Sequence, residues 1–286
     1  MNHNLNLTLM KKTLTFLCLV LLGSGVFYSC QDEQNVDNFS VSDGVRSQLI
    51  SLGFDVVVHP PIKFDQGYLV EGDIYLTPAD LAVMKSGGKL PVVEQYSTDN
   101  LVNATGGRVI TMYAPVGGST GYSAGMIAGL DLAISRYNAE GLNITFQRLT
   151  SSTGANIVMT RLSKAEERRG ILGSAGFPTA SGDPYYEIKM SGILESTYGL
   201  STAGIATIIA HEMGHCVGFR HTDYYDRSVS CGGALSNEGA STVGANLIPG
   251  TPATATLAAK SWMLACTNGG DRPFNNDDKT ALNYLY

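Results

Sequence analysis

The chain has 286 residues, of which 15% are charged, and its formal net charge at pH 7 is −6. An acidic chain without a cluster of basic residues lacks the electrostatic footprint of a nucleic-acid-binding protein, so we expect no nucleic-acid partner. The length is enough for one compact domain and a shorter leading segment. We expect a monomer.

The N-terminus has the pattern of an export signal. Two lysines, at positions 11 and 12, precede an apolar run over residues 13–28 that leads to Cys30. The run is short for a membrane span, and acidic rather than basic residues follow it. The stretch Phe27–Cys30 resembles a bacterial lipoprotein cleavage box. We therefore predict a signal peptide over residues 1–29 and a lipid anchor on Cys30. The product would be an exported bacterial lipoprotein at the outer membrane or cell surface, or secreted after processing. The alternative is ordinary secretion with Cys30 unmodified.

Residues 30–104 are interpreted as a polar tether followed by a pro-segment. We expect a short apolar helix at Val45–Leu52, a strand at Gly67–Leu76 and a helix at Pro78–Met84. A break rich in glycine and proline at 87–91 then separates this segment from a more regular pattern.

Residues 105–286 have the pattern of one domain that mixes strands and helices. A closing helix is expected at Asp277–Tyr286, capped by Asn275 or Asn276, with its acidic residues at the N-terminal end. Apolar periodicity predicts the remaining elements. They are a strand at Arg108–Tyr113, a helix at Ala124–Tyr137, and strands at Asn143–Leu149, Ala155–Leu162 and Tyr185–Met190.

From His211 to His221 the chain reads H-E-x-x-H-x-x-G-x-x-H, on a helix that Ser201 is expected to cap. Two histidines four residues apart lie on one helix face and can bind one metal ion, so His211 and His215 are predicted ligands. Gly218 lets the helix end and the backbone turn through a conformation that a Cβ would penalise. The chain then returns His221 as a third ligand. Three imidazoles that leave a fourth position open to water are typical of a catalytic zinc.

Glu212 follows the first ligand directly in the sequence. Its side chain projects beside the ligand face, within reach of a water molecule at the open position. Glutamate can take a proton from such a water, so we predict that Glu212 is the general base.

Apart from Cys30, three cysteines remain after the predicted signal: Cys216, Cys231 and Cys266. Export permits a disulfide, and an odd number of cysteines allows at most one within the chain. We favour a disulfide between Cys231 and Cys266, with Cys216 packed on the helix as a small apolar residue. A Cys216–Cys231 disulfide is the main alternative.

The motif and the order of elements around it resemble the metzincin metallopeptidases over residues 105–286, and in detail the dual-action HEIGH metallopeptidase family. Met213 stands where that family's name implies isoleucine, and both residues are apolar. The resemblance implies an α+β fold: a twisted mixed sheet with two helices, the motif helix, a Met-turn at Met263 and a C-terminal helix, preceded by a small pro-segment. It also implies that the strand near Gly173–Pro178 binds substrate as an added strand. The residues that carry the resemblance are His211–Tyr225, Cys231–Gly233, Ile248–Pro252, Ser261–Cys266 and Arg272–Tyr286.

The stretch Val70–Ile74 resembles the F-x-G-D segment of astacin pro-peptides, in which an aspartate occupies the open position of the zinc. Here a valine replaces the phenylalanine. A carboxylate is a competent zinc ligand, and one tethered in the same chain has a high effective concentration. Our hypothesis is that Asp73 is an inhibitory switch. The alternative is that Gly72 and Asp73 form an ordinary turn between strands.

Together these interpretations predict an exported zinc endopeptidase with one catalytic Zn²⁺ and a protein or peptide substrate. The sequence leaves calcium undecided. A zinc hydrolase of cell-wall peptides or amides is one alternative. A non-catalytic surface-binding lipoprotein with a structural metal is another. That second alternative would need a fourth protein ligand, and the intact Glu212 argues against it, because a structural site has no use for a base.

Overall fold

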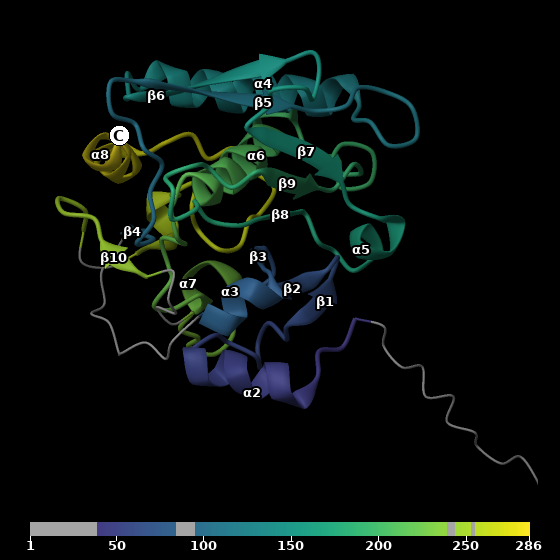
Figure 1. Ribbon diagram of the computed structural model, residues 1–286, viewed down its shortest axis with the longest axis vertical. Coiled ribbons are helices and arrows are strands. Elements are labelled where there is room, and N and C mark those ends of the chain that lie inside the picture. Colours follow the sequence, from purple (N-terminus) through teal and green to yellow (C-terminus); the bar gives the residue numbers. More distant parts are fainter. Residues whose placement is uncertain (1–38, 84–94, 239–243, 253–254) are drawn as a thin grey trace, which may run out of the picture. The chain divides into compact units, whose positions relative to one another are not determined.

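The computed structural model describes residues 39–83, 95–238, 244–252 and 255–286, and residues from Phe39 to Tyr286 form one compact unit (Figure 1). The predicted signal peptide, Cys30 and the start of the tether lie outside the described residues. Among the helices of the described part, none is long and apolar enough to cross a membrane.

An eight-stranded mixed sheet runs through this unit. Its strands are β1 (Ile62–Phe64), β2 (Gly67–Val70), β3 (Ile74–Leu76), β5 (Arg108–Tyr113), β6 (Ile144–Leu149), β7 (Ile157–Arg161), β8 (Gly173–Ala175) and β9 (Glu187–Met190). Their spatial order is β1-β2-β3-β8-β9-β7-β5-β6. The pairs β9–β7, β7–β5 and β5–β6 are parallel, and β8 runs antiparallel to β9. At the other end, β1, β2 and β3 form an antiparallel meander that joins β8 through a parallel pairing.

Three capped helices surround the main core. These are α4 (Ala124–Ala139), α6 (Thr202–Cys216) and α8 (Asn276–Leu285), whose N-caps are Ser123, Ser201 and Asn275. Helices α4 and α6 pack together where Gly129 faces Ile205, since a Cβ on that glycine would collide with the isoleucine. The smaller elements are α2 (Asp43–Leu52), α3 (Pro78–Val83), α5 (Lys164–Arg168), α7 (Ser228–Cys231), the 3-10 helix η1 (Leu257–Ala259), and a second sheet of β4 (Tyr96–Ser97) and β10 (Asn246–Leu247).

Residues 39–83, here called the N-terminal segment, form a small core of their own. It includes the buried side chains of Leu49, Phe54 and Ile74, and Phe177 from the rest of the chain packs against it. A second cluster joins the two parts, since Phe64 and Tyr75 pack with Ile171. Burial of these apolar side chains holds the N-terminal segment against the edge of the sheet at β8.

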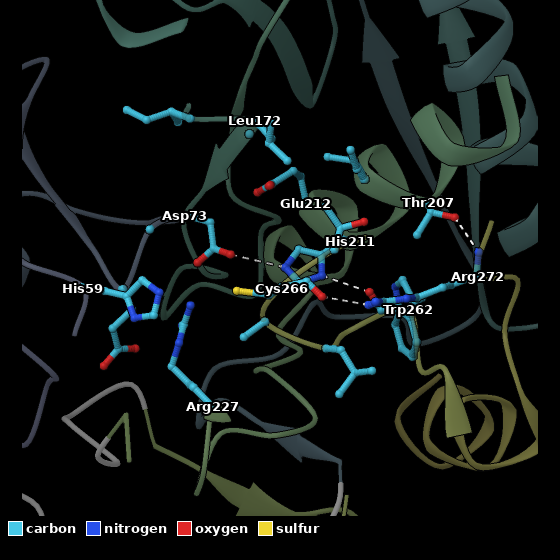
Figure 2. Close-up of a pocket in the computed structure, with 18 of the residues that line it drawn as sticks. His59, Asp73, Leu172, Thr207, His211, Glu212, Arg227, Trp262, Cys266 and Arg272 are labelled. Carbon is cyan, nitrogen blue, oxygen red and sulfur yellow. Dashed lines mark hydrogen bonds and ion pairs between the residues drawn. The ribbon is translucent and has the colours of Figure 1, made fainter. Parts of the chain in front are cut away.

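The prediction of one continuous strand at 67–76 is wrong. Glu71 and Gly72 have φ angles of 55° and 98°, and the chain reverses there to form the β2–β3 hairpin. A positive φ at two successive residues makes a tight turn whose twist suits a hairpin, and glycine takes such a conformation at little cost. Asp73 follows this turn directly, and its side chain points toward His211 (Figure 2).

Residues 95–104, which the sequence analysis assigned to the pro-segment, pack with the C-terminal part. The Thr98 N–H donates to the Gly218 carbonyl at 2.8 Å, and the Arg220 N–H donates to the Tyr96 carbonyl at 2.9 Å. The Ile248 N–H donates in turn to the Gln95 carbonyl at 3.0 Å. The change in packing therefore lies before residue 95 rather than at residue 104.

Candidate metal centre and active site

Helix α6 carries the first two predicted ligands, and the turn after it carries the third. The helix ends at Cys216, and the chain then passes through Gly218 with a φ of 104°. A Cβ at this position would press on neighbouring residues, so glycine is needed for both its conformation and its size. The reversal brings His221 back to face His211 and His215.

The three histidines converge on one point. The Nε2 atom of His211 lies 3.1 Å from that of His215 and 3.2 Å from that of His221. All three side chains are buried. Tetrahedral zinc with Zn–N bonds of 2.0–2.1 Å separates its ligand atoms by about 3.3 Å, so the spacing found here fits such an ion.

The other ring nitrogens fix the direction of the Nε2 lone pairs. The Nδ1 atoms of His211 and His215 lie 2.9 Å from the carbonyl oxygens of Trp262 and Phe219, respectively. A carbonyl only accepts hydrogen bonds, so each Nδ1 must carry a proton and each Nε2 is free of one in the neutral ring. Lone pairs that face one another in a buried site call for a cation between them. The residues present therefore fit a zinc ion.

Asp73 comes from the N-terminal segment and completes a group of four. Its Oδ2 atom lies 3.1 Å from the Nε2 of His221 and 3.6 Å from the Nε2 of His211. The four ligand atoms of Asp73 and the three histidines lie within 4.8 Å of one another. Burial alone would raise the pKa of Asp73, but the charge and the hydrogen bond of His221 hold it well below its ordinary value. The carboxylate is therefore ionised.

Glu212 lies beside this group and is 2% exposed (Figure 2). Its Oε2 atom is buried and has no hydrogen-bond partner among the described residues. Burial and the nearby charge of Asp73 raise the pKa of Glu212 well above its ordinary value. Gly173 of β8 leaves the space for this carboxylate, because a Cβ there would collide with it.

Met263 lies beneath the motif helix and is fully buried. Its sulfur occupies the space next to Gly214, where a Cβ would come within 2.5 Å of it. The backbone around Met263 is tied to the turn after α6, since the Thr222 N–H donates to the Met263 carbonyl at 2.8 Å. The predicted Met-turn residue is thus close to the ligands, as a soft apolar support.

Sequence reasoning missed Glu238. This fully buried carboxylate accepts a hydrogen bond from the Nδ1 atom of His221 and another from Arg227 at 2.6 Å. Burial alone would raise its pKa, but His221 and Arg227 lower it to about 2. Glu238 stands 17 residues after His221 in an irregular stretch, so no spacing rule could have identified it.

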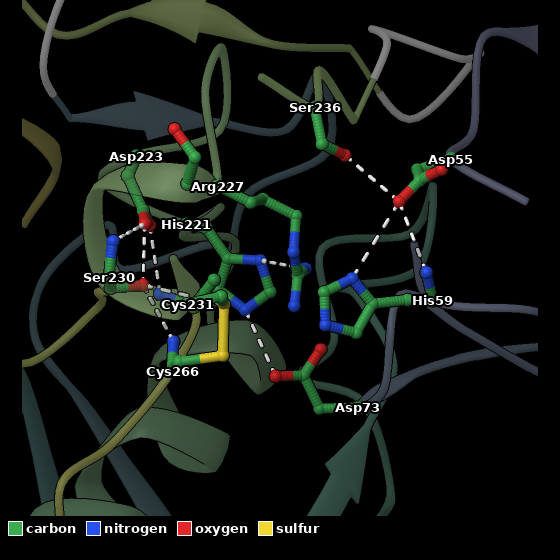
Figure 3. The surroundings of a disulfide bond; sticks show 12 residues. Asp55, His59, Asp73, His221, Asp223, Arg227, Ser230, Cys231, Ser236 and Cys266 are labelled. Carbon is green, nitrogen blue, oxygen red and sulfur yellow. Dashed lines mark hydrogen bonds and ion pairs between the residues drawn. A yellow bond between two sulfur atoms is a disulfide. The ribbon is translucent and has the colours of Figure 1, made fainter. Parts of the chain in front are cut away.

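Cys231 and Cys266 form a disulfide, and Cys216 is a free, buried cysteine on α6 (Figure 3). The disulfide ties α7 to the chain that follows Met263. Asp223 supports the same junction: it accepts hydrogen bonds from Ser230 and from the Ala265 N–H. The loop that carries Arg227 and the loop beside the histidines are therefore held to each other.

A cavity of about 230 Å³ opens next to the predicted ligands. Its walls come from the N-terminal segment, from β8, from α6 and from residues 262–272 (Figure 2). His211, Glu212 and Asp73 all line it. A peptide that reached this cavity would thus contact the metal centre and the predicted base.

The fold and the site together define a metal-dependent hydrolase: a mixed α+β domain in which a buried carboxylic acid adjoins three converging imidazoles. The family model described as dual-action HEIGH metallo-peptidase matches residues 68–286, so the chain belongs to that family and is a metallopeptidase. This result confirms the predicted family and the predicted α+β peptidase domain.

Two solved structures of myroilysin are similar to part of the chain. The first has 17% sequence identity and a TM-score of 0.36, and covers 64% of this chain and 95% of its own. The second has 18% identity and a TM-score of 0.34, and covers 60% of this chain and 80% of its own. No curated protein matches the chain.

Proposed function

We propose that this metallopeptidase is a zinc-dependent endopeptidase that its own N-terminal segment holds inactive through Asp73. The observation that carries the proposal is the convergence of four ligand atoms. Three come from the motif helix and the turn after it, and the fourth comes from a hairpin more than a hundred residues earlier in the chain. A purely structural site needs no free carboxylic acid beside it, yet Glu212 adjoins this group.

Three histidines would hold the zinc: His211, His215 and His221. When bound, zinc supplies Lewis acidity toward the scissile carbonyl and the attacking water. Glu212 takes the proton from the water and returns it to the leaving amine. Its burial suits this role, because a raised pKa brings proton uptake and release closer to neutral pH.

The other groups of the site orient the imidazole rings and bind the substrate backbone. The Trp262 and Phe219 carbonyls and the Glu238 carboxylate fix the three imidazole rings through their Nδ1 atoms. Strand β8 offers backbone groups to a substrate that adds as a further strand. In the latent protein the N-terminal segment uses that same edge, since the Ala175 N–H donates to the Asp73 carbonyl at 3.1 Å.

Latency follows from this arrangement in two ways. The Asp73 carboxylate takes the position that water needs, and β3 takes the strand edge that substrate needs. Removal of the N-terminal segment, by a cut before residue 95, would release both. The lipidated N-terminus at Cys30 and an exported location belong to the same proposal, with protein or peptide as substrate.

The test uses the full-length, zinc-loaded chain with casein as substrate. Asp73→Ala frees the open metal position but leaves β3 on the strand edge. We therefore expect this variant to hydrolyse casein below the rate of a cleaved protein but at least about tenfold faster than the wild-type chain, and a chelator to abolish the activity. Glu212→Ala introduced together with Asp73→Ala should keep its zinc and lose hydrolysis.

Asp43→Ala is the matched control, because Asp43 is an exposed aspartate of the same segment, far from the ligands in sequence. It should behave as wild type. Equal activity of wild type and Asp73→Ala would end the idea of an aspartate switch. An active Asp73→Ala,Glu212→Ala double variant would end the assignment of the base.

A further inference from the structure

The charged groups around the cavity divide between the two parts of the chain. The N-terminal segment contributes the carboxylates of Glu71 and Asp73. The C-terminal part contributes two arginines, Arg227 and Arg272, against the one carboxyl of Glu212. Once the N-terminal segment has left, the cavity walls lose both of its carboxylates, so their charge becomes more positive. A cavity of this kind favours an acidic occupant.

Arg227 is already neutralised. Its Nη1 atom lies 2.6 Å from Glu238 Oε1, and both side chains are almost fully buried. The guanidinium also lies next to the His221 ring, with Nη1 3.3 Å from Nδ1. Arg227 is therefore part of the support of the metal centre and is not available to a substrate carboxylate.

Arg272 lacks such a partner. It is only 5% exposed, yet no carboxylate of the described residues lies within 4.0 Å of its guanidinium. Its Nη1 atom donates one hydrogen bond, to the Cys266 carbonyl at 2.9 Å. Burial lowers the pKa of Arg272, with Asp223 opposing the shift, but an arginine stays charged in proteins. A guanidinium that is so little exposed and forms no ion pair with a described residue is stabilised by a ligand that brings a negative charge.

The surroundings hold Arg272 in a fixed direction. Its backbone N–H donates to the Thr207 hydroxyl of α6 at 2.8 Å, and its side chain runs from there toward the Cys266 wall of the cavity (Figure 2). Cys266 is itself fixed by the disulfide. Apolar side chains, Ile208 and Leu264 among them, line the same cavity and could cover the methylene groups of a bound side chain.

We propose that Arg272 is a specificity-determining residue that binds an acidic side chain of the peptide substrate, at one fixed position beside the scissile bond. The inference rests on the proposed function and names its substrate class: peptides with aspartate or glutamate at that position. A planar guanidinium matches a carboxylate with two parallel hydrogen bonds, and it discriminates strongly where water is excluded.

The first measurement is the cleavage profile of the full-length Asp73→Ala protein. A mixture of proteome-derived peptides is digested, and the ends produced are identified by mass spectrometry. We expect aspartate and glutamate to be enriched at one position relative to the cut. A matched pair of peptides that differ only as glutamate and glutamine at that position should then differ by about 10- to 100-fold in kcat/KM.

Variants of Arg272 in the same protein show whether the arginine causes the preference. Arg272→Gln should remove most of the difference in kcat/KM between the paired peptides. Arg272→Lys should keep part of the difference, because it keeps the charge. Arg148→Gln is the control: Arg148 pairs with Asp131 on the surface, and its loss should leave the preference intact.

Binding gives a readout that does not depend on turnover. Trp262 is the only tryptophan of the chain and lines the cavity, so its fluorescence can report peptide binding to the Asp73→Ala,Glu212→Ala protein. The glutamate peptide should bind about 10-fold or more tightly than its glutamine partner. Cleavage and binding without a preference for acidic residues would overturn the inference alone. Failure to cleave any peptide would overturn the proposed function and the inference together.

Discussion

At the scale of single residues, the site depends on how each imidazole is held. The Nδ1 atoms of His211 and His215 donate to backbone carbonyls, whereas the Nδ1 atom of His221 donates to the Glu238 side chain. A carboxylate on the far nitrogen of a ligand histidine fixes its tautomer and raises its basicity. Glu238 is therefore the residue outside the ligand set whose loss should affect metal binding most.

We predict that Glu238→Ala weakens zinc binding by about 10- to 100-fold, because His221 loses its orientation and Arg227 its partner. The measurement is competition with a chromophoric chelator on the full-length chain, with circular dichroism to check folding. Glu238→Gln retains the shape and should lose less. Glu187→Ala, at a half-buried position of β9, is the control. An unchanged zinc affinity in Glu238→Ala would remove the positioning role.

At the scale of elements, the motif helix and its closing turn are the part that sequence predicted best. Ser201 caps α6, and Gly218 ends the motif with a positive φ. These features are local: the cap, the helical spacing and the glycine with positive φ each depend on residues that are close in sequence. The strand Arg108–Tyr113 is found with the predicted bounds for the same reason.

Features that depend on distant contacts were predicted less well. The hairpin turn at Glu71 falls in the middle of the predicted strand, because its apolar neighbours continue the alternation. The short helix α5 and the pairing of β4 with β10 were missed. Both β4 and β10 are only two residues long, and each gains its hydrogen bonds from a partner far away in sequence. The roles of buried charged residues such as Glu238 and Arg272 depend on tertiary contacts, which the sequence pattern does not show.

The contact between β8 and α6 leads to a prediction at the same scale. Gly173→Ala places a methyl group where the Glu212 carboxylate lies, so the base must move while the ligands stay. In the Asp73→Ala background we expect kcat/KM to fall about 100-fold with zinc content unchanged. Ser174→Ala, the next residue on β8, is the control. Loss of zinc together with activity in Gly173→Ala would contradict this account.

At the scale of the whole molecule, the N-terminal segment is an integral part of the fold. It extends the sheet at β8, has its own small core, and packs Phe64 and Tyr75 against Ile171. Ser236 donates a further hydrogen bond to Asp55 at 2.9 Å. Release of Asp73 therefore requires the loss of many contacts at once, which suits an irreversible cut better than a reversible opening.

The most direct test of the central claim is a crystal structure of the zinc-loaded full-length chain, with the metal located by anomalous scattering at the zinc edge. We expect zinc at about 2.0–2.1 Å from the Nε2 atoms of His211, His215 and His221, with an oxygen of Asp73 as the fourth ligand. A zinc ion bound elsewhere, or bound by the three histidines with water in the fourth position and Asp73 turned away, would contradict the account.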